Sequence, residues 1–206
     1  MLMRDGRRPQ RGTTLLELMV TVTILGILMA VGIPSMRDWL LRNSVTVGAE
    51  VIQNGLRQAE AEAIRRNARV EFLLTNDKPS VASISSISAA GNGANWAVRV
   101  LDSTFSPLAD TKLAYVNAQS MSEVAPDLSI SGPASVVFSG TGRGSNIKGV
   151  ALTEYQIYRI SRTGADRALC VFVTPGGGVK MCDPSATSGT PAACAPLVSL
   201  DRCPKP

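Results

Sequence analysis

The chain has 206 residues, a formal net charge of +5 and no histidine. This length suits one globular domain with an anchor, and without histidine no Ser-His-Asp or Cys-His catalytic site forms within the chain. Residues 1–12 hold four arginines and one aspartate, so they supply +3 of the net charge and leave the remainder weakly basic. The charge therefore gives little support for a nucleic-acid partner. We expect no enzymatic activity, metal or cofactor.

An uncharged apolar segment, residues 18–33, follows the basic start of the chain. Extended back to Thr13, it approaches the roughly 20 residues that a helix needs to cross a bilayer. No A-x-A cleavage pattern closes the segment, so we expect it to stay as an anchor. The arginines before it predict a cytoplasmic N-terminus. Glu17 lies almost at the start of the segment, where a carboxylate is costly and needs a partner.

Beyond Pro34, apolar residues recur mostly every three, four or seven positions as far as Ala63, which predicts an amphipathic helix. Pro34 removes one backbone hydrogen bond and is expected to kink the helix. Gly48 and Gly55 fall inside the pattern and weaken it slightly. We predict one helix over residues 13–67, with its first half in lipid and its second half on a sheet.

From Val70 onward, the period of the sequence changes to the alternation of short strands. Seven or eight such strands after one long helix predict an α+β fold with antiparallel sheets. The predicted strands are residues 70–75, 81–87, 96–101, 113–116, 135–138, 154–160, 168–173 and 178–182. Residues 140–145 lack the GK[ST] ending of a phosphate-binding loop and are predicted as a turn.

The four cysteines all lie in the last quarter of the chain, at Cys170, Cys182, Cys194 and Cys203. An even number in a Gly/Pro/Ser-rich tail predicts disulfides and an oxidising compartment. Residues 167–182 predict a hairpin around Pro-Gly-Gly-Gly, with Cys170 and Cys182 equidistant from Gly176. We therefore predict Cys170–Cys182 and Cys194–Cys203, while Cys182–Cys194 remains an open alternative.

The stretch Gly12-Thr13-Thr14-Leu15-Leu16-Glu17-Leu18 resembles the class III signal of type IV pilins and pseudopilins. The resemblance implies that a prepilin peptidase cuts between Gly12 and Thr13 and methylates Thr13, where the family more often has Phe. The cut would create an α-amine within a helical turn of Glu17. In a stack of parallel helices, Glu17 of one subunit can pair with the amine of its neighbour and set the assembly register.

Residues 56–67 resemble the stretch that ends this helix in the GspH/FimT branch of the family. The resemblance implies a leader (1–12), a transmembrane half-helix (13–34) and a periplasmic, then extracellular, pilin-like head (35–206). It implies a FimT/FimU-like minor pilin at the tip of a type IV pilus, with a GspH-like minor pseudopilin of a type II secretion system as the alternative. The implied partners are other minor pilins, the major pilin or pseudopilin, the peptidase and the inner membrane.

The cysteine-bearing hairpin also resembles that of FimT-like minor pilins, some of which bind DNA through a Gly-Arg-x-Arg turn. This chain has Gly177-Gly178-Val179-Lys180 there, with glycine and lysine in place of the two arginines. A phosphate-binding turn needs clustered cations. The alternative of a different class is thus a DNA-binding tip receptor that contacts DNA through Lys180 and Arg167.

Overall fold

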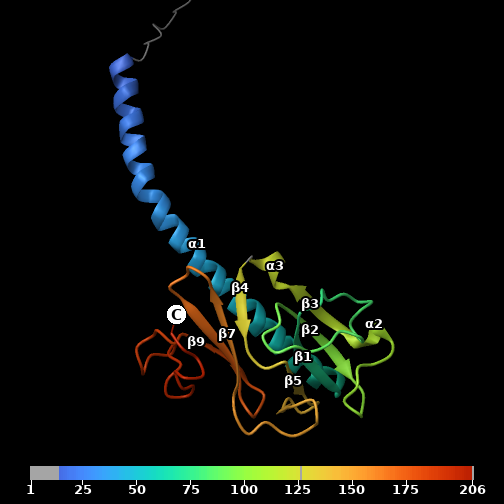
Figure 1. Ribbon diagram of the computed structural model, residues 1–206. Helices are drawn as coiled ribbons and strands as arrows, with labels where there is room; N and C mark the ends of the chain where they lie inside the picture. The colour runs from blue at the N-terminus through green and yellow to red at the C-terminus, as the bar shows by residue number, and fades with distance from the viewer. Residues whose placement is uncertain (1–13, 126, 206) are drawn as a thin grey trace, which may run out of the picture. The chain divides into compact units, whose positions relative to one another are not determined.

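The computed structural model describes residues 14–125 and 127–205, so Gly12 and Thr13 lie outside the described residues. The described chain divides between Trp39 and Leu40 into two units. One helix, α1 (Leu15–Arg66), contributes to both units, as predicted from the apolar pattern (Figure 1). The kink expected at Pro34 remains a prediction.

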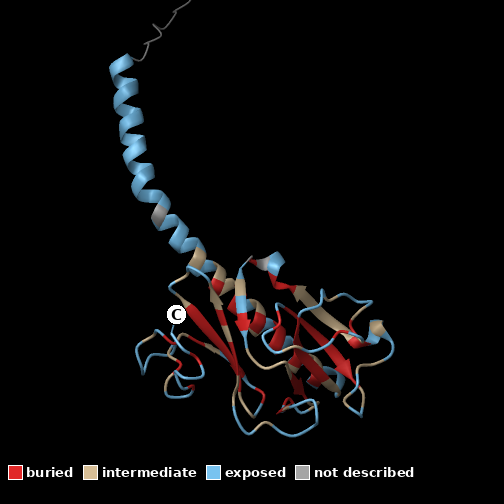
Figure 2. Cartoon of the chain, viewed as in Figure 1, coloured by how far each residue is buried: buried red, intermediate tan, exposed pale blue. Residues whose placement is uncertain are grey.

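The first unit, as far as it is described, is the apolar part of α1, and its large hydrophobic side chains are exposed (Figure 2). The most apolar 18-residue stretch of α1 has a mean hydropathy of 2.3. Among the described helices, α1 alone is long and apolar enough to cross a membrane. The hydroxyls of Thr21 and Thr23 donate to carbonyls of the same helix, at 2.9 and 2.7 Å. Such internal bonds suit an apolar surrounding, where water does not reach the hydroxyls.

In the second unit, α1 buries one continuous face. The buried apolar residues on this face follow steps of four and three and are Val45, Ala49, Ile52, Leu56, Ala59 and Ala63. This spacing places them on one side of a helix with 3.6 residues per turn. They belong to one core cluster with the inward-facing residues of the two sheets described below.

Gly48 and Gly55 lie on the buried side of α1, where they let the helix approach both sheets. A Cβ added to Gly48 would be 2.7 Å from Leu128 Cδ1, and one added to Gly55 would be 2.9 Å from the Trp96 ring and 3.0 Å from the Phe72 ring. Glycine has a low helix propensity, so the two glycines weaken the helix pattern in the sequence. Their role in the structure is to allow this close packing.

The first sheet has five antiparallel strands in the order β3-β2-β1-β5-β6. Its strands are β1 (Arg69–Thr75), β2 (Asn95–Leu101), β3 (Tyr115–Ser120), β5 (Ser135–Phe138) and β6 (Gly144–Ser145). Two single-turn helices, α2 (Thr111–Ala114) and α3 (Met121–Val124), flank β3.

The second sheet has four antiparallel strands in the order β4-β7-β8-β9. Its strands are β4 (Leu128–Ser131), β7 (Gln156–Arg162), β8 (Ala168–Val173) and β9 (Val179–Cys182). Tyr158 of β7 meets Phe72 of β1 edge-to-face at 5.5 Å between ring centroids, which joins the two sheets.

The predicted α+β fold with a long N-terminal helix on antiparallel sheets is confirmed. Two strand predictions were wrong or incomplete: residues 81–86 form turns, and residues 113–116 divide between α2 and β3. The turns form because Ser80 and Ser83 bond to each other and the Ser83 carbonyl accepts from Ser86 and Ile87. These local side-chain bonds compete with a strand. The short strands β4 and β6 were not predicted.

Candidate functional site

The first feature is the start of α1, where Thr14 caps the helix. Its hydroxyl oxygen accepts a hydrogen bond from the Glu17 backbone N–H at 3.2 Å, and its carbonyl accepts from Leu18 N–H at 3.2 Å. A Thr-x-x-Glu sequence at this place is the capping-box pattern. This role of Thr14 was not predicted, although the Thr-x-x-Glu pattern is present in the sequence.

Glu17 lies in the first turn of α1, where a negative charge interacts favourably with the helix dipole. Its neighbours Leu15, Leu16 and Leu18 expose large apolar side chains, and Glu17 itself is exposed. Within the part of the chain that the structure describes, the Glu17 carboxylate makes no hydrogen bond or ion pair. The arrangement is a single acid at the capped end of an exposed apolar helix, open to a cation from another molecule.

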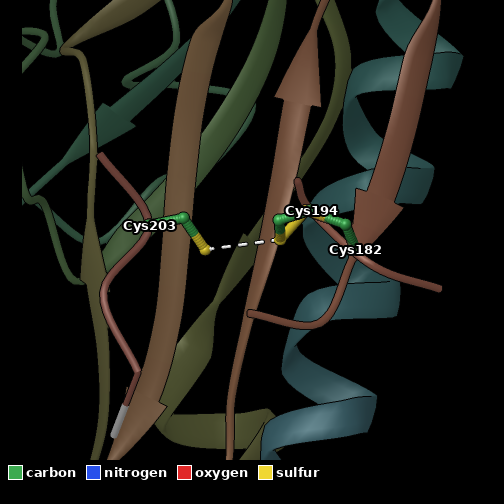
Figure 3. A group of neighbouring side chains, drawn as sticks. All are labelled: Cys182, Cys194 and Cys203. Carbon is green, nitrogen blue, oxygen red and sulfur yellow. Dashed lines mark hydrogen bonds between the residues drawn. A yellow bond between two sulfur atoms is a disulfide. The ribbon is translucent and has the colours of Figure 1, made fainter. Parts of the chain in front are cut away.

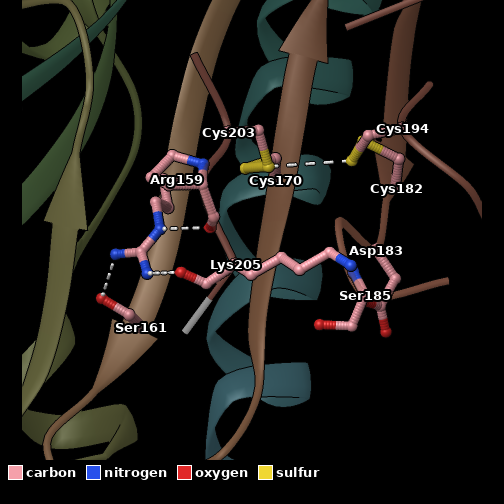
Figure 4. Close-up of a disulfide and its surroundings, with 10 residues drawn as sticks. Arg159, Ser161, Cys170, Cys182, Asp183, Ser185, Cys194, Cys203 and Lys205 are labelled. Carbon is pink, nitrogen blue, oxygen red and sulfur yellow. Dashed lines mark hydrogen bonds between the residues drawn. A yellow bond between two sulfur atoms is a disulfide. The ribbon is translucent and has the colours of Figure 1, made fainter. Parts of the chain in front are cut away.

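The second feature is the C-terminal tail, where the predicted disulfide pairing is wrong. The structure pairs Cys170 with Cys203 at a Cα–Cα distance of 6.3 Å (Figure 4). It pairs Cys182 with Cys194 at a Cα–Cα distance of 4.9 Å (Figures 3 and 4). Cys170 and Cys182 are cross-strand partners of β8 and β9, as the hairpin symmetry predicted. Each nevertheless bonds to the tail, because the tail crosses the same sheet face and brings Cys203 and Cys194 beside them. The open alternative, Cys182–Cys194, is the pair observed.

The tail covers the outer face of the second sheet. A separate apolar cluster contains Ile157 and Phe172 of the sheet, Val198 of the tail and the four cysteines. Arg159 of β7 donates to the carbonyls of Pro204 and Lys205, at 3.1 and 3.5 Å (Figure 4). The disulfides thus fasten a segment that hides an apolar sheet face. Three cysteine sulfurs lie within 4.8 Å of one another, but all are in disulfides and offer no thiolate for a metal.

The third feature is the hairpin proposed from sequence to contact DNA. Lys180 is exposed on β9. Arg167, by contrast, is turned to the protein: its guanidinium lies 3.4 Å from Asp183 Oδ2 and donates to Thr46 Oγ1 at 3.4 Å. A Cβ added to Gly177 would collide with the Gly142 carbonyl, so the hairpin turn packs closely on the turn after β5. DNA contact by Lys180 and Arg167 remains a prediction.

Further basic residues near the hairpin also make internal contacts. Arg159 holds the tail, and Arg162 donates to Ser44 Oγ at 2.9 Å and lies 4.0 Å from Asp127. These arginines connect strands, helix and tail, which is a structural use of positive charge rather than a free basic patch.

An apolar helix that continues into an antiparallel β head defines a pilin-like protein, and the comparisons agree. The family model described as type II transport protein GspH matches residues 48–177, more than half of the chain. The prokaryotic N-terminal methylation motif matches residues 7–33, which include Gly12, Thr13 and Glu17. The chain belongs to the pilin-like GspH family.

Two solved structures resemble the chain, and both are crystal structures of the type IV minor pilin FimU of Pseudomonas aeruginosa. The crystal form in space group P21 is 15% identical, with a TM-score of 0.50 over 72% of this chain and 96% of FimU. The form in P65 is 14% identical, with a TM-score of 0.46 over 69% and 95%. The first match shows the shared pilin fold. No curated protein matches the sequence.

The family match ends at Gly177, so β9 and the tail lie beyond it. Three of the four cysteines are in this additional segment: Cys182, Cys194 and Cys203. The tail and its disulfides therefore elaborate the outer face of a sheet whose other strands fall inside the family match.

Proposed function

We propose that the chain is a minor pilin that assembles at the tip of a type IV pilus, with a structural rather than catalytic role. Membership of the GspH family, the methylation motif and the FimU-like fold support a minor subunit of a pilus or pseudopilus. The alternative is a minor pseudopilin of a type II secretion system. The resemblance to FimU favours the pilus only at the level of fold.

The observation that carries the proposal is Glu17 at the capped start of an exposed apolar helix. Before assembly, the apolar part of α1 anchors the subunit in the inner membrane, with the N-terminus cytoplasmic and the head periplasmic. The prepilin peptidase removes residues 1–12 and leaves an α-amine on Thr13. That amine becomes N-methylated in this proposal.

In the filament, the Glu17 carboxylate pairs with the Thr13 amine of a neighbouring subunit. Burying either charge alone among apolar helices costs several kcal/mol, and pairing offsets that cost. Because a one-turn slip of the helix would separate the charges, the pair selects one axial position. The cap on Glu17 N–H by Thr14 fixes the helix start from which this position is measured.

The test is a Glu17→Ala variant of the full chain, expressed in a host that has the peptidase and filament machinery. We expect normal removal of the leader but loss of the subunit from sheared, purified filaments. Glu50→Ala is the matched control, since Glu50 is an exposed glutamate on the same helix. Recovery of Glu17→Ala in filaments at the control level would contradict the register role.

The same purification of sheared filaments helps to distinguish a type IV pilus from a type II secretion pseudopilus. Association of the chain with surface pili, and loss of pili on its deletion, would support the type IV pilus. Loss of protein secretion with normal pili would instead assign the subunit to a type II secretion pseudopilus.

A further inference from the structure

A cavity of about 390 Å³ opens beside the first sheet. It is bounded by the start of β1, the loop after β2, the turn between β5 and β6, and the loop after β6. Small-molecule sites in proteins have volumes of roughly 300–1,000 Å³. The lining combines two arginines (Arg69 and Arg143), two serines (Ser139 and Ser145), Phe105 and three small residues. Among the described residues, no acidic side chain lines this cavity.

Phe105 forms one wall and is held there by its surroundings. Its φ is +63°, a conformation that is unusual for a bulky residue. The turn that imposes it is organised by Asp102, whose Oδ1 accepts from Thr104 N–H at 2.7 Å and from Ser106 N–H at 3.0 Å. The Phe105 ring also packs on Gly149, where an added Cβ would be 2.7 Å from the ring.

Arg69 is stacked on this ring. Its Cζ lies 4.5 Å from the Phe105 ring centroid, within the range of a cation–π contact. One terminal nitrogen donates to the Asp102 carbonyl at 3.4 Å. The pKa of the Asp102 carboxyl is lowered, mainly by the hydrogen bond from Thr104 and to a smaller extent by the Arg69 charge. In the described residues, Arg69 forms no salt bridge.

Arg143 enters from the turn between β5 and β6. Ser139 N–H donates to the Arg143 carbonyl at 3.0 Å, and Gly142 N–H donates to the Ser139 carbonyl at 2.8 Å. Gly142 has a φ of +78°, which favours glycine and fixes the turn. The Arg143 side chain is exposed and, like that of Arg69, has no carboxylate within salt-bridge distance in the described part of the chain.

We propose that this cavity binds a small organic anion through its carboxylate or phosphate group. Guanidinium groups bind such oxyanions with paired hydrogen bonds, and a stacked guanidinium is already oriented. The Ser139 hydroxyl supplies a further donor when it accepts from Thr141 Oγ1, which lies 2.9 Å away. The Ser145 hydroxyl already donates to the Val137 carbonyl. The Phe105 ring contacts the uncharged part of the ligand. This site is separate from Glu17 and from the assembly role.

The test uses the detergent-solubilised full chain at low ionic strength, titrated with inorganic phosphate and with glucuronate in a calorimeter. We expect saturable binding of one anion per chain. Each substitution removes hydrogen bonds to a charged group, so Arg69→Gln and Arg143→Gln should each weaken binding about tenfold or more. Arg57→Gln, which removes the same charge from an exposed helix position, should leave binding unchanged.

The two probes distinguish the anionic groups, because a phosphate site and a carboxylate site differ in which titration saturates. Circular dichroism checks that each variant is folded. If Arg69→Gln unfolds the protein, the exposed Arg143 decides the outcome. Absence of saturable binding by both probes, or an equal loss with Arg57→Gln, would overturn the proposal.

Discussion

Glu71 of β1 and Arg99 of β2 form a buried ion pair across the first sheet. Arg99 Nε lies 2.7 Å from Glu71 Oε2, and their side chains are 7% and 1% exposed, in that order. The two residues lie directly opposite each other in the antiparallel pair of β1 and β2. A second nitrogen of Arg99 donates to the carbonyls of Ile84 and Ile87, at 3.1 and 3.0 Å. The pair therefore fastens the long loop between β1 and β2 onto the sheet.

Arg99→Met should lower the free energy of unfolding by about 3–5 kcal/mol, because it leaves the Glu71 carboxylate buried without a cation. The measurement is urea unfolding followed by tryptophan fluorescence. Arg57→Met, at an exposed position, is the control. Replacing both members, in Glu71→Leu with Arg99→Met, should cost less than Arg99→Met alone. A double variant that is less stable than the single would contradict this account.

Disulfide mapping should find Cys170–Cys203 and Cys182–Cys194. Chain-entropy arguments assign more stabilisation to the larger loop, of sequence separation 33 against 12. Replacing Cys170 and Cys203 by serine should therefore lower the free energy of unfolding by about 3–4 kcal/mol, roughly 1 kcal/mol more than replacing Cys182 and Cys194. Detection of a Cys170–Cys182 peptide in non-reducing digests would restore the pairing predicted from the sequence.

Gly55→Ala should destabilise the head although alanine favours helices. The gain in helix propensity is about 1 kcal/mol, but the new methyl would lie 2.9 Å from Trp96 and 3.0 Å from Phe72. Overpacking of this kind costs about 1–3 kcal/mol. Asn54→Ala, at the exposed neighbouring position, should be neutral or stabilising. Thermal unfolding of the two variants checks the prediction, and a raised Tm for Gly55→Ala would refute it.

Glu62 should contribute a pH-dependent part of the stability. Its pKa is lowered from 4.5 to about 2, first by the hydrogen bond from Arg65 and then by that from Arg66. A lowered folded-state pKa means that the contribution is complete above about pH 4.5 and is lost as the pH falls through about 2. Arg65 is largely exposed, so we expect only about 1 kcal/mol.

Glu62→Gln should remove this contribution at neutral pH and flatten the stability profile between pH 4.5 and 2. The profile is measured by urea unfolding at a series of pH values, with the exposed Glu50→Gln as control. A wild-type slope that persists in Glu62→Gln would assign the effect to other carboxylates.

The elements with a clear period were predictable from the sequence. The helix pattern predicted α1, because burial of one face imposes its period. Short apolar runs rich in β-branched and aromatic residues predicted β1, β2, β5 and β8, which are buried on both faces. The disulfide prediction was wrong because hairpin symmetry describes only β8 and β9. The observed pairing depends on where the C-terminal tail crosses the face of the second sheet. The strand expected at residues 81–87 failed because serine hydroxyls closed turns there.

The roles of the other site residues could not be predicted from the sequence, for a different reason. Glu71, Arg99, Arg69 and Arg143 have no motif, since each acquires its role from a partner distant in sequence. Glu17 was identified because its carboxylate interrupts an apolar segment, a signal that needs no tertiary information.

The most direct test of the account is the intact mass and N-terminal sequence of the chain after co-expression with a prepilin peptidase. We predict loss of residues 1–12 and a new N-terminus at Thr13, with the mass of one added methyl group. A chain that keeps its N-terminus in the presence of an active peptidase, while a known prepilin in the same cells is cut, would contradict it.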